Sequence, residues 1–137
     1  MSPFFQKKSM LSYLDNVFPQ VRGRLSILSL KQKQARLKLL VNDGDLRPGG
    51  TVSGPSMFLL ADVAFYVLVL YNIGEKPLAV TTNCSINFLR KPEAIDLIAE
   101  AQMLKMGKTL AVGDVLIKSP KSQSVVAHAC FTYSIPK

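Results

Sequence analysis

The most prominent feature of the hydropathy pattern is a nearly continuous apolar run at residues 57–71. A cap at Ser53 or Gly54 and then Pro55 precede the run, and turn-forming residues occupy 72–77. These are typical start and stop signals, so we predict a helix from Pro55 to about residue 71. A helix that is apolar all round is buried on every side, and we therefore expect this one at the centre of the fold.

The rest of the chain is dominated by alternation of apolar and polar residues, which is typical of half-buried strands. The predicted strands are residues 24–30 and 34–41, joined by a turn at 31–33, then 80–88, then 97–106 and 109–118 around a turn at Gly107, and finally 125–135. A short amphipathic helix is predicted at 9–18. The expected architecture is α+β, with about five or six antiparallel strands curled around one long central helix.

Length and composition predict one domain. The chain has 137 residues, of which 48% are hydrophobic, and this is enough to bury a core. We expect a single domain over 1–137 with residues 1–20 as an N-terminal extension or short helix. The N-terminal residues lack the pattern of a secretory signal, and Asp62 interrupts an apolar run shorter than the ~20 residues of a spanning helix. A cytoplasmic protein that is not in a membrane is therefore expected.

The charge and the scarcity of metal-binding residues narrow the possible functions. Seventeen Lys and Arg against nine Asp and Glu give a formal charge of +8, which favours an anionic partner such as a nucleic acid, a membrane surface or a phosphorylated small molecule. Neither a basic helix nor an aromatic strip accompanies this charge, so we do not expect nucleic-acid binding. One histidine, His128, and two cysteines, Cys84 and Cys130, cannot form a Cys/His zinc cluster. A Ser-His-Asp triad needs only one histidine, but no serine is marked as its nucleophile, and we interpret His128 as structural and both thiols as inert.

Asp62 is the most informative residue, because it is the only side chain between Ser53 and Asn72 that is charged at neutral pH. An unpaired carboxylate in an apolar helix is costly. It is either a structural group with a partner on another strand, or the nucleophile or general base at the edge of a ligand pocket. A glycine-rich loop and a helix N-terminus, whose free amides can hold an oxyanion, precede it and favour the second interpretation.

Three segments carry a resemblance to a known family. Residues 47–65 read RPGGTVSGPSMFLLADVAF, 87–92 read NFLRKP and 104–113 read LKMGKTLAVG. They resemble the hotdog-fold acyl-CoA thioesterases of the phenylacetate-pathway (PaaI) type, which have a His-Gly-Gly turn followed by a helix with Leu-Ala-Asp. The similarity extends over about residues 42–135. It implies a hotdog fold and hydrolysis of an acyl-CoA thioester to a free acid and coenzyme A.

The resemblance also implies roles for individual residues. Asp62 takes the place of the catalytic carboxylate, and Gly54 that of the glycine whose backbone N–H binds the thioester oxygen. Thr81 lies near the position of the hydroxyl that orients water, although the length of the intervening loop leaves Thr82 as an alternative. Whether Asp62 is nucleophile or general base stays open.

The sequence departs from the family pattern at three positions. Ser53 replaces the motif histidine and Pro55 its second glycine, and we expect both to border the substrate. An asparagine often found six residues before the motif falls at Arg47, with Asn42 and Asp45 as nearby substitutes. These departures keep an alternative function open, that of a non-catalytic acyl-CoA-binding or regulatory hotdog protein.

Four basic residues are candidates for binding coenzyme A. Arg90, Lys91, Lys105 and Lys108 fall at a strand end and a turn, where they form either a phosphate site or a solvated rim. No metal or prosthetic group is implied. Coenzyme A enters only as part of the substrate. The family's active sites lie between two subunits, and the resemblance therefore implies a homodimer or homotetramer with Asp62 of one subunit facing Gly54 of the other.

Overall fold

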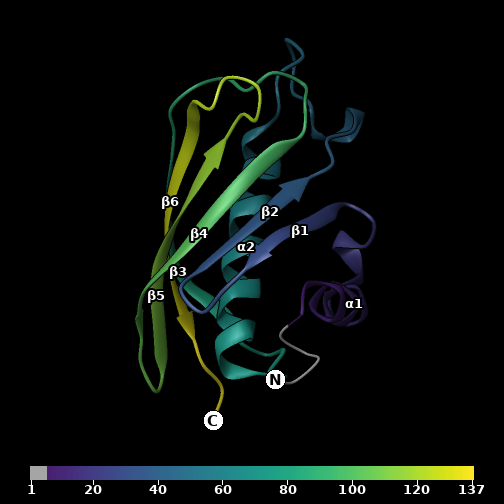
Figure 1. Cartoon of the computed structure of the whole chain (residues 1–137). Helices are drawn as coiled ribbons and strands as arrows, with labels where there is room; N and C mark the ends of the chain where they lie inside the picture. Colours follow the sequence, from purple (N-terminus) through teal and green to yellow (C-terminus); the bar gives the residue numbers. More distant parts are fainter. Residues whose placement is uncertain (1–5) are drawn as a thin grey trace.

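The computed structural model describes residues 6–137, which form two α-helices, two short 3-10 helices and six strands (Figure 1). In chain order these are α1 (Lys7–Val17), η2 (Pro19–Val21), β1 (Leu25–Leu30), β2 (Gln34–Leu39), η3 (Asp43–Asp45), α2 (Gly54–Ile73), β3 (Val80–Phe88), β4 (Leu97–Met106), β5 (Leu110–Lys118) and β6 (Val125–Ser134).

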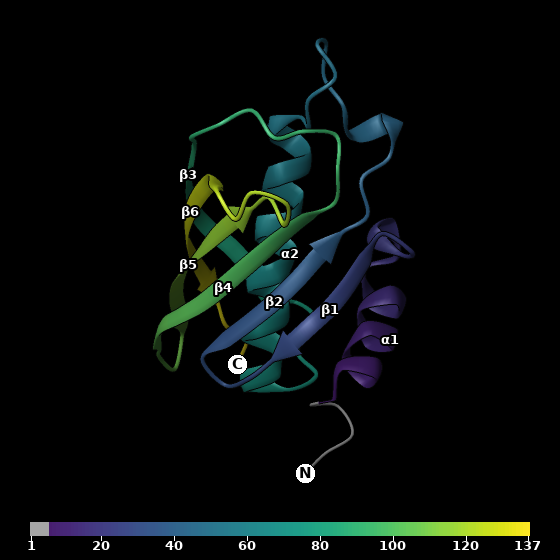
Figure 2. The same ribbon diagram turned by 45° about the horizontal axis from the view of Figure 1, so that its top comes forward.

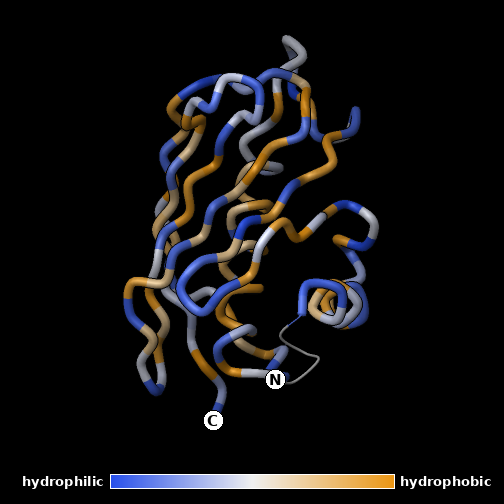
Figure 3. The backbone as a smooth tube through the Cα atoms, in the orientation of Figure 1, coloured by the Kyte–Doolittle hydropathy of each residue, from blue (hydrophilic) through white to orange (hydrophobic). Residues whose placement is uncertain are grey.

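All six strands belong to one antiparallel sheet with the order β1-β2-β4-β5-β6-β3. The sheet curves around α2, which lies along its concave face (Figures 1 and 2). The inward-facing positions of β2, β4, β5 and β6 alternate with outward-facing ones, as the hydropathy colouring of Figure 3 shows. The predicted α+β architecture is confirmed.

The central helix begins and ends close to the predicted residues. The Ser53 hydroxyl accepts a hydrogen bond from the Ser56 N–H at 3.4 Å, and Gly74 ends the helix with a φ of 85°. By length and composition alone, this 20-residue helix would suffice to cross a membrane, so the expectation that the apolar segment is too short is wrong. However, 67% of its apolar window is buried against the rest of the protein, as in the core helix of a folded domain.

One close approach fixes the distance between the sheet and α2. A Cβ at Gly113 of β5 would lie 2.2 Å from the Gln102 carbonyl oxygen and 2.3 Å from the Phe65 ring, so only glycine fits there. Phe65 then stacks on Phe131 of β6 with ring centroids 5.7 Å apart. This contact holds the middle of α2 against β6.

Helix α1 covers the side of the sheet that begins with β1 (Figure 2). It starts two residues before the predicted helix, and its Met10 and Leu14 are fully buried in the same core as α2. The N-terminal segment is therefore part of the domain as far as residue 6. Residues 1–5 of the predicted extension lie outside the described residues.

Strand β3 forms the other edge of the sheet and departs from simple alternation. Its register with β6 shifts between Thr81 and Asn83, so Thr81, Cys84 and Ile86 are the half-buried residues. Simple alternation along the strand would bury residues 80, 82, 84, 86 and 88 together, but only Cys84 and Ile86 among them are half-buried. Val80 and Phe88 are 56% and 50% exposed, which leaves apolar side chains along a free sheet edge.

Candidate active site

Asp62 lies half-buried in the middle of α2, and two hydroxyl groups hold it. The Thr81 hydroxyl donates to Asp62 Oδ1 at 2.7 Å, and the Tyr133 hydroxyl donates to the same oxygen at 2.8 Å. No Lys, Arg or His of residues 6–137 forms an ion pair with Asp62, and its Oδ2 accepts no hydrogen bond from those residues. Asp62 thus has hydrogen-bond partners but no cation, and one of its oxygens is left available.

The irregularity in β3 decides which threonine reaches this carboxylate. Because the strand bulges between Thr81 and Asn83, Thr81 turns toward α2. Thr82 turns away from the site, and its hydroxyl donates to the Thr132 carbonyl at 3.2 Å. Of the two residues left open by the sequence, the structure brings Thr81 to Asp62.

Tyr133 is the residue of this site that sequence reasoning missed. It faces Thr81 directly in the register of β3 and β6, and it is 2% exposed. Its place on the apolar face of the last strand gave it the pattern of a core residue. The only signal in the sequence is the Tyr133 hydroxyl itself, because a tyrosine hydroxyl on a buried face needs a polar partner.

A cavity of about 320 Å³ lies beside Asp62. Apart from Asp62, Thr81 and Gln20, its walls are mostly apolar or aromatic: Val17, Phe18, Tyr66, Pro77, Ala79, Val80 and Tyr133. The Tyr66 hydroxyl donates to the Pro77 carbonyl at 2.7 Å, away from Asp62. Burial, together with a smaller effect of Tyr13, raises the pKa of Tyr66 to about 12, so this wall is neutral at physiological pH.

A second cavity, of about 510 Å³, lies at the N-terminus of α2. Its lining includes Gly54, Met57, Phe88, Arg90 and Lys91. A Cβ at Gly54 would lie 3.3 Å from the Phe88 ring, so a side chain there would press on this wall. With Arg47, the cavity thus combines a helix start, an aromatic ring and three cationic side chains.

Gly54 carries a free backbone N–H at this helix start. The Ser53 N–H donates to the Asp45 carbonyl, Pro55 has no N–H, and the Ser56 N–H donates to the Ser53 hydroxyl. Among residues 6–137, the Gly54 N–H has no hydrogen-bond partner. A free amide at a helix N-terminus can stabilise an oxyanion.

The two motif departures lie at the same helix start but play different parts. Ser53 is half-buried and forms the helix cap, with its hydroxyl 3.2 Å from that of Ser56. Pro55 is exposed at the second helical position. Neither residue lines the two cavities described above, whereas Arg47 lines the cavity at Gly54.

The four predicted basic residues do not form one cluster within the chain. Arg90 and Lys91 belong to the segment that follows β3, at the top of Figure 1, whereas Lys105 is near the end of β4 and Lys108 is in the β4–β5 turn, at its lower left. Residues 97–104 of β4 lie between the two pairs, and they correspond to about 26 Å at the usual rise of a strand. The prediction of a single cluster is therefore wrong, because the two pairs lie at opposite ends of the same strand.

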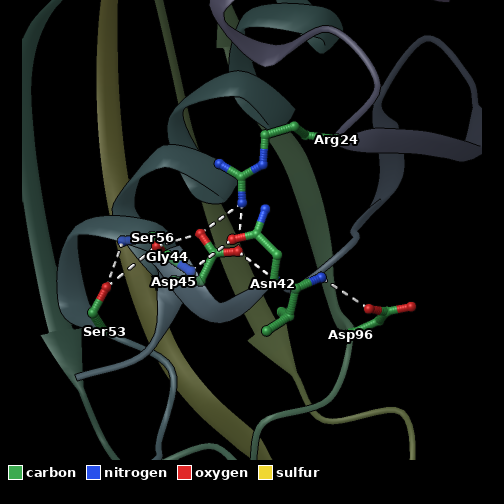
Figure 4. A network of polar contacts seen from close by, with 8 residues as sticks. Arg24, Asn42, Gly44, Asp45, Ser53, Ser56 and Asp96 are labelled. Carbon is green, nitrogen blue, oxygen red and sulfur yellow. Dashed lines mark hydrogen bonds and ion pairs between the residues drawn. The ribbon is translucent and has the colours of Figure 1, made fainter. Parts of the chain in front are cut away.

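Asp45 forms a second, fully satisfied carboxylate site next to the start of α2 (Figure 4). The Arg24 guanidinium donates to both its oxygens at 2.6 and 2.5 Å, the Ser56 hydroxyl donates at 2.7 Å, and the Asn42 N–H donates at 2.9 Å. Burial by itself would raise the pKa of Asp45, but these hydrogen bonds and the charge of Arg24 outweigh burial and lower it.

This network corrects two expectations. The alternation of apolar and polar residues would place Arg24 on a solvated face, but it is half-buried in an ion pair with Asp45. Asn42 and Asp45 were possible substitutes for the family's asparagine, but they cap η3 together and line neither cavity.

The sole histidine and both cysteines line neither of the two cavities. His128 Nε2 is 2.9 Å from Asp114 Oδ2 of the neighbouring strand β5. Burial and the nearby charge of Asp62 raise the pKa of Cys84, which favours its thiol form. Cys130 is an exposed free cysteine.

Comparison with known proteins identifies the family. The Thioesterase superfamily matches residues 49–126, which include both cavities' helix and most of the sheet. The chain belongs to this superfamily. No protein of curated function matches the sequence significantly.

Similarity to solved structures extends beyond residues 49–126 to the whole of this chain. A protein of Silicibacter sp. TM1040 whose thioesterase name is provisional is 50% identical, with a TM-score of 0.90, over 100% of this chain and 96% of that chain. The E. coli PaaI protein of the phenylacetic acid degradation operon is 26% identical over 96% of this chain and 92% of its own, with a TM-score of 0.81. A Streptococcus mutans UA159 protein bound to acetyl CoA is 25% identical over 85% and 91%, with a TM-score of 0.76. The hotdog fold and the resemblance to PaaI proteins are confirmed.

Proposed function

We propose that this superfamily member hydrolyses an acyl-CoA thioester to a carboxylic acid and coenzyme A. The observation that carries the proposal is the carboxylate of Asp62, which opens onto a largely apolar cavity with one oxygen unengaged. A carboxylate paired with a cation would be a structural group, whereas one held by neutral hydroxyls keeps its charge available for chemistry.

The chemistry requires one basic oxygen and one oxyanion site. Asp62 Oδ2 either attacks the thioester carbonyl carbon or removes a proton from a water molecule that attacks it. The carbonyl oxygen becomes an oxyanion, which the Gly54 N–H and the N-terminus of α2 stabilise. When the intermediate collapses, the C–S bond breaks and coenzyme A leaves as a thiolate that takes up a proton. In the attack by Asp62 itself, water then hydrolyses the resulting acyl anhydride.

The two cavities suit the two parts of such a substrate. The apolar and aromatic cavity beside Asp62 accommodates an acyl group. Arg90 and Lys91 offer positive charge for the phosphates of coenzyme A beside Gly54. The relative that binds acetyl CoA supports this class of ligand.

A second copy of the chain completes the site in this proposal. Gly54 and Asp62 are eight residues apart on one helix, or about 12 Å, too far for both to reach one carbonyl group. The free edge of β3 carries exposed Val80 and Phe88, which a second β3 edge would cover. A two-fold dimer would then place Asp62 of one copy opposite Gly54 of the other.

Mixed dimers test this arrangement. Asp62→Asn and Gly54→Val chains are each expected to be inactive, but a mixed dimer retains one intact site. Co-expression should therefore restore about a quarter of wild-type activity, given random pairing of the two chains. Light scattering that gives a mass near the 15.1 kDa of one chain, or no restored activity in verified mixed dimers, would contradict the shared site.

Turnover of a panel of short, long and aromatic acyl-CoAs tests the function itself. Wild type should release free coenzyme A from at least one class, and Asp62→Asn should not. If wild type binds acyl-CoAs tightly in calorimetry and releases no thiol, the protein is the non-catalytic binding module. In that case, the replacements of the family's motif residues by Ser53 and Arg47 would be the expected reason for the missing hydrolysis.

A further inference from the structure

We propose that Tyr133 is a positioning residue that fixes the Asp62 carboxylate and leaves Oδ2 as its reacting oxygen. The inference rests on the proposed hydrolase function. Its basis is the pair of hydroxyl donors on one carboxylate oxygen, Thr81 from one strand and Tyr133 from the next.

The position of Tyr133 is fixed by both the sheet and the packing around its ring. Tyr133 and Thr81 are direct partners in the register of β6 and β3, so their side chains project together toward α2. The Tyr133 ring lies 5.4 Å from Phe65, 6.2 Å from Tyr66 and 6.5 Å from Phe131, measured between centroids. A ring held on three sides has little freedom, and its hydroxyl therefore defines where Oδ1 lies.

Two donors on Oδ1 determine the orientation of the carboxylate. The Tyr133 hydroxyl is 2.8 Å from Oδ1 and 3.2 Å from the Asp62 carbonyl oxygen, and its single proton is best shared with the nearer, charged oxygen. A rotation about χ2, other than the 180° flip that exchanges the two equivalent oxygens, would lose the hydrogen bond to one hydroxyl or to both. The carboxylate is thus held in one orientation without being neutralised.

Tyr133 donates this hydrogen bond over the whole physiological pH range. Burial, with a further effect from the charge of Asp62, strongly raises the pKa of the Tyr133 phenol. It therefore stays protonated and does not act as an acid in the reaction. The other titratable groups around the site are Tyr66 of α2 and Cys84 of β3, whose pKa values are also raised.

The test compares Tyr133→Phe with Tyr66→Phe. Both variants remove one buried hydroxyl from the wall of the same cavity, but only Tyr133 contacts Asp62. Loss of a donor to the carboxylate should lower kcat about 10- to 100-fold in Tyr133→Phe, with a smaller change in KM. It should also move the acid limb of the pH profile of kcat/KM up by about one pH unit, because the ionised carboxylate has lost a donor. In Tyr66→Phe the acid limb should stay at its wild-type position.

A carboxyl ¹³C NMR titration provides a readout that needs no turnover. The Asp62 signal, assigned with Asp62→Asn, should titrate at higher pH in Tyr133→Phe than in wild type or Tyr66→Phe. An unchanged titration together with an unchanged acid limb would overturn the positioning role even if wild type is a good hydrolase. Conversely, a shifted signal in a protein without turnover would retain the role of Tyr133 and reject the hydrolase. A loss of activity without any pH shift would make Tyr133 a packing residue only.

Discussion

Two aspartates near the first half of α2 show how differently one protein uses the same side chain. Asp45 is 2% exposed, and it accepts hydrogen bonds from an arginine, a serine and a backbone amide. Asp62 is half-buried beside a cavity, and its hydrogen bonds to neutral hydroxyls are all made through one oxygen. The first carboxylate has both oxygens engaged, whereas the second has one left.

Under the proposed function, this difference distinguishes a structural carboxylate from a catalytic one. The Asp45 network ties η3 to the start of α2 through Ser56, and to the turn before β1 through Arg24, so it stabilises the loop that presents Gly54 (Figure 4). The charge of Asp45 is balanced by the arginine beside it, and removal of the carboxylate would leave that arginine without a partner. A carboxylate with one free oxygen keeps its charge for an incoming substrate, at some cost in stability.

Asp62→Asn should give the largest effect and the sharpest contrast. We expect turnover to fall about 1000-fold or more, since a positioned base alone contributes about 100- to 10,000-fold. The melting temperature should equal or exceed that of wild type, because a buried charge is removed and the amide oxygen of the new side chain can still accept from Thr81 and Tyr133. Thiol release and thermal denaturation of the same preparations check this prediction. A much lower melting temperature would make Asp62 structural.

Asp45→Asn should have the opposite profile. Every group around Asp45 donates, so the amide NH₂ of an asparagine would face a donor and leave Arg24 without its charge partner. We expect a loss of about 2–3 kcal/mol in the free energy of unfolding, measured by urea denaturation. Asp43→Asn is the matched control, because Asp43 is exposed in the same 3-10 turn. Equal stability of the two variants would contradict a structural role.

The same network predicts a pH dependence of stability. The pKa of Asp45 is lowered in the folded protein, so its contribution is fully present above the ordinary aspartate value of about 4 and is lost as the pH falls through the folded value. Wild type should therefore lose more stability than Asp45→Asn between pH 6 and about pH 3. Glu100, whose pKa is lowered chiefly by the Lys118 hydrogen bond and also by Arg36, adds the same trend to both proteins. Parallel stability curves would exclude a contribution from Asp45.

The smallest expected effect concerns the charge beside Gly54. Two double variants are compared: one combines Arg90→Gln and Lys91→Gln, and the other combines Lys105→Gln and Lys108→Gln. Each changes the formal charge from +8 to +6, a loss of two positive charges. Only the first pair should weaken coenzyme A binding, by several-fold at low salt and less at 1 M, where the screening length is about 3 Å. Calorimetric titration at two salt concentrations checks this. An equal loss for both pairs would indicate a nonspecific effect of net charge.

The fold was predictable from the sequence because its strongest signals are local. The helix start at Ser53, Pro55 and the apolar run that follows placed α2 within two residues at each end. The turn at Gly107 placed a hairpin, and the lone charge of Asp62 marked the site. Each of these signals depends on neighbours along the chain.

The remaining parts of the site depend on contacts between distant residues, and periodicity does not encode them. A bulge turns Thr81 inward, although simple alternation would put it on the other face of the strand from Cys84. Tyr133 reaches Asp62 across 71 positions, and Arg24 reaches Asp45 across 21. Arg90 and Lys108 are close in sequence but far apart in space, since an extended strand carries the chain the length of the sheet between them.

The rigid spacing of Gly54 and Asp62 along α2 has a consequence for how the chain can change length. One inserted residue between them would rotate Asp62 by about 100° around the helix relative to Gly54 and advance it by about 1.5 Å, so the two groups would no longer keep their present relative orientation. The interval of eight residues therefore sets the relative position of the two groups, and a single insertion or deletion within it would disrupt the site. Changes of chain length should instead accumulate in connections such as the exposed residues 121–123, whose length does not set the spacing of the site.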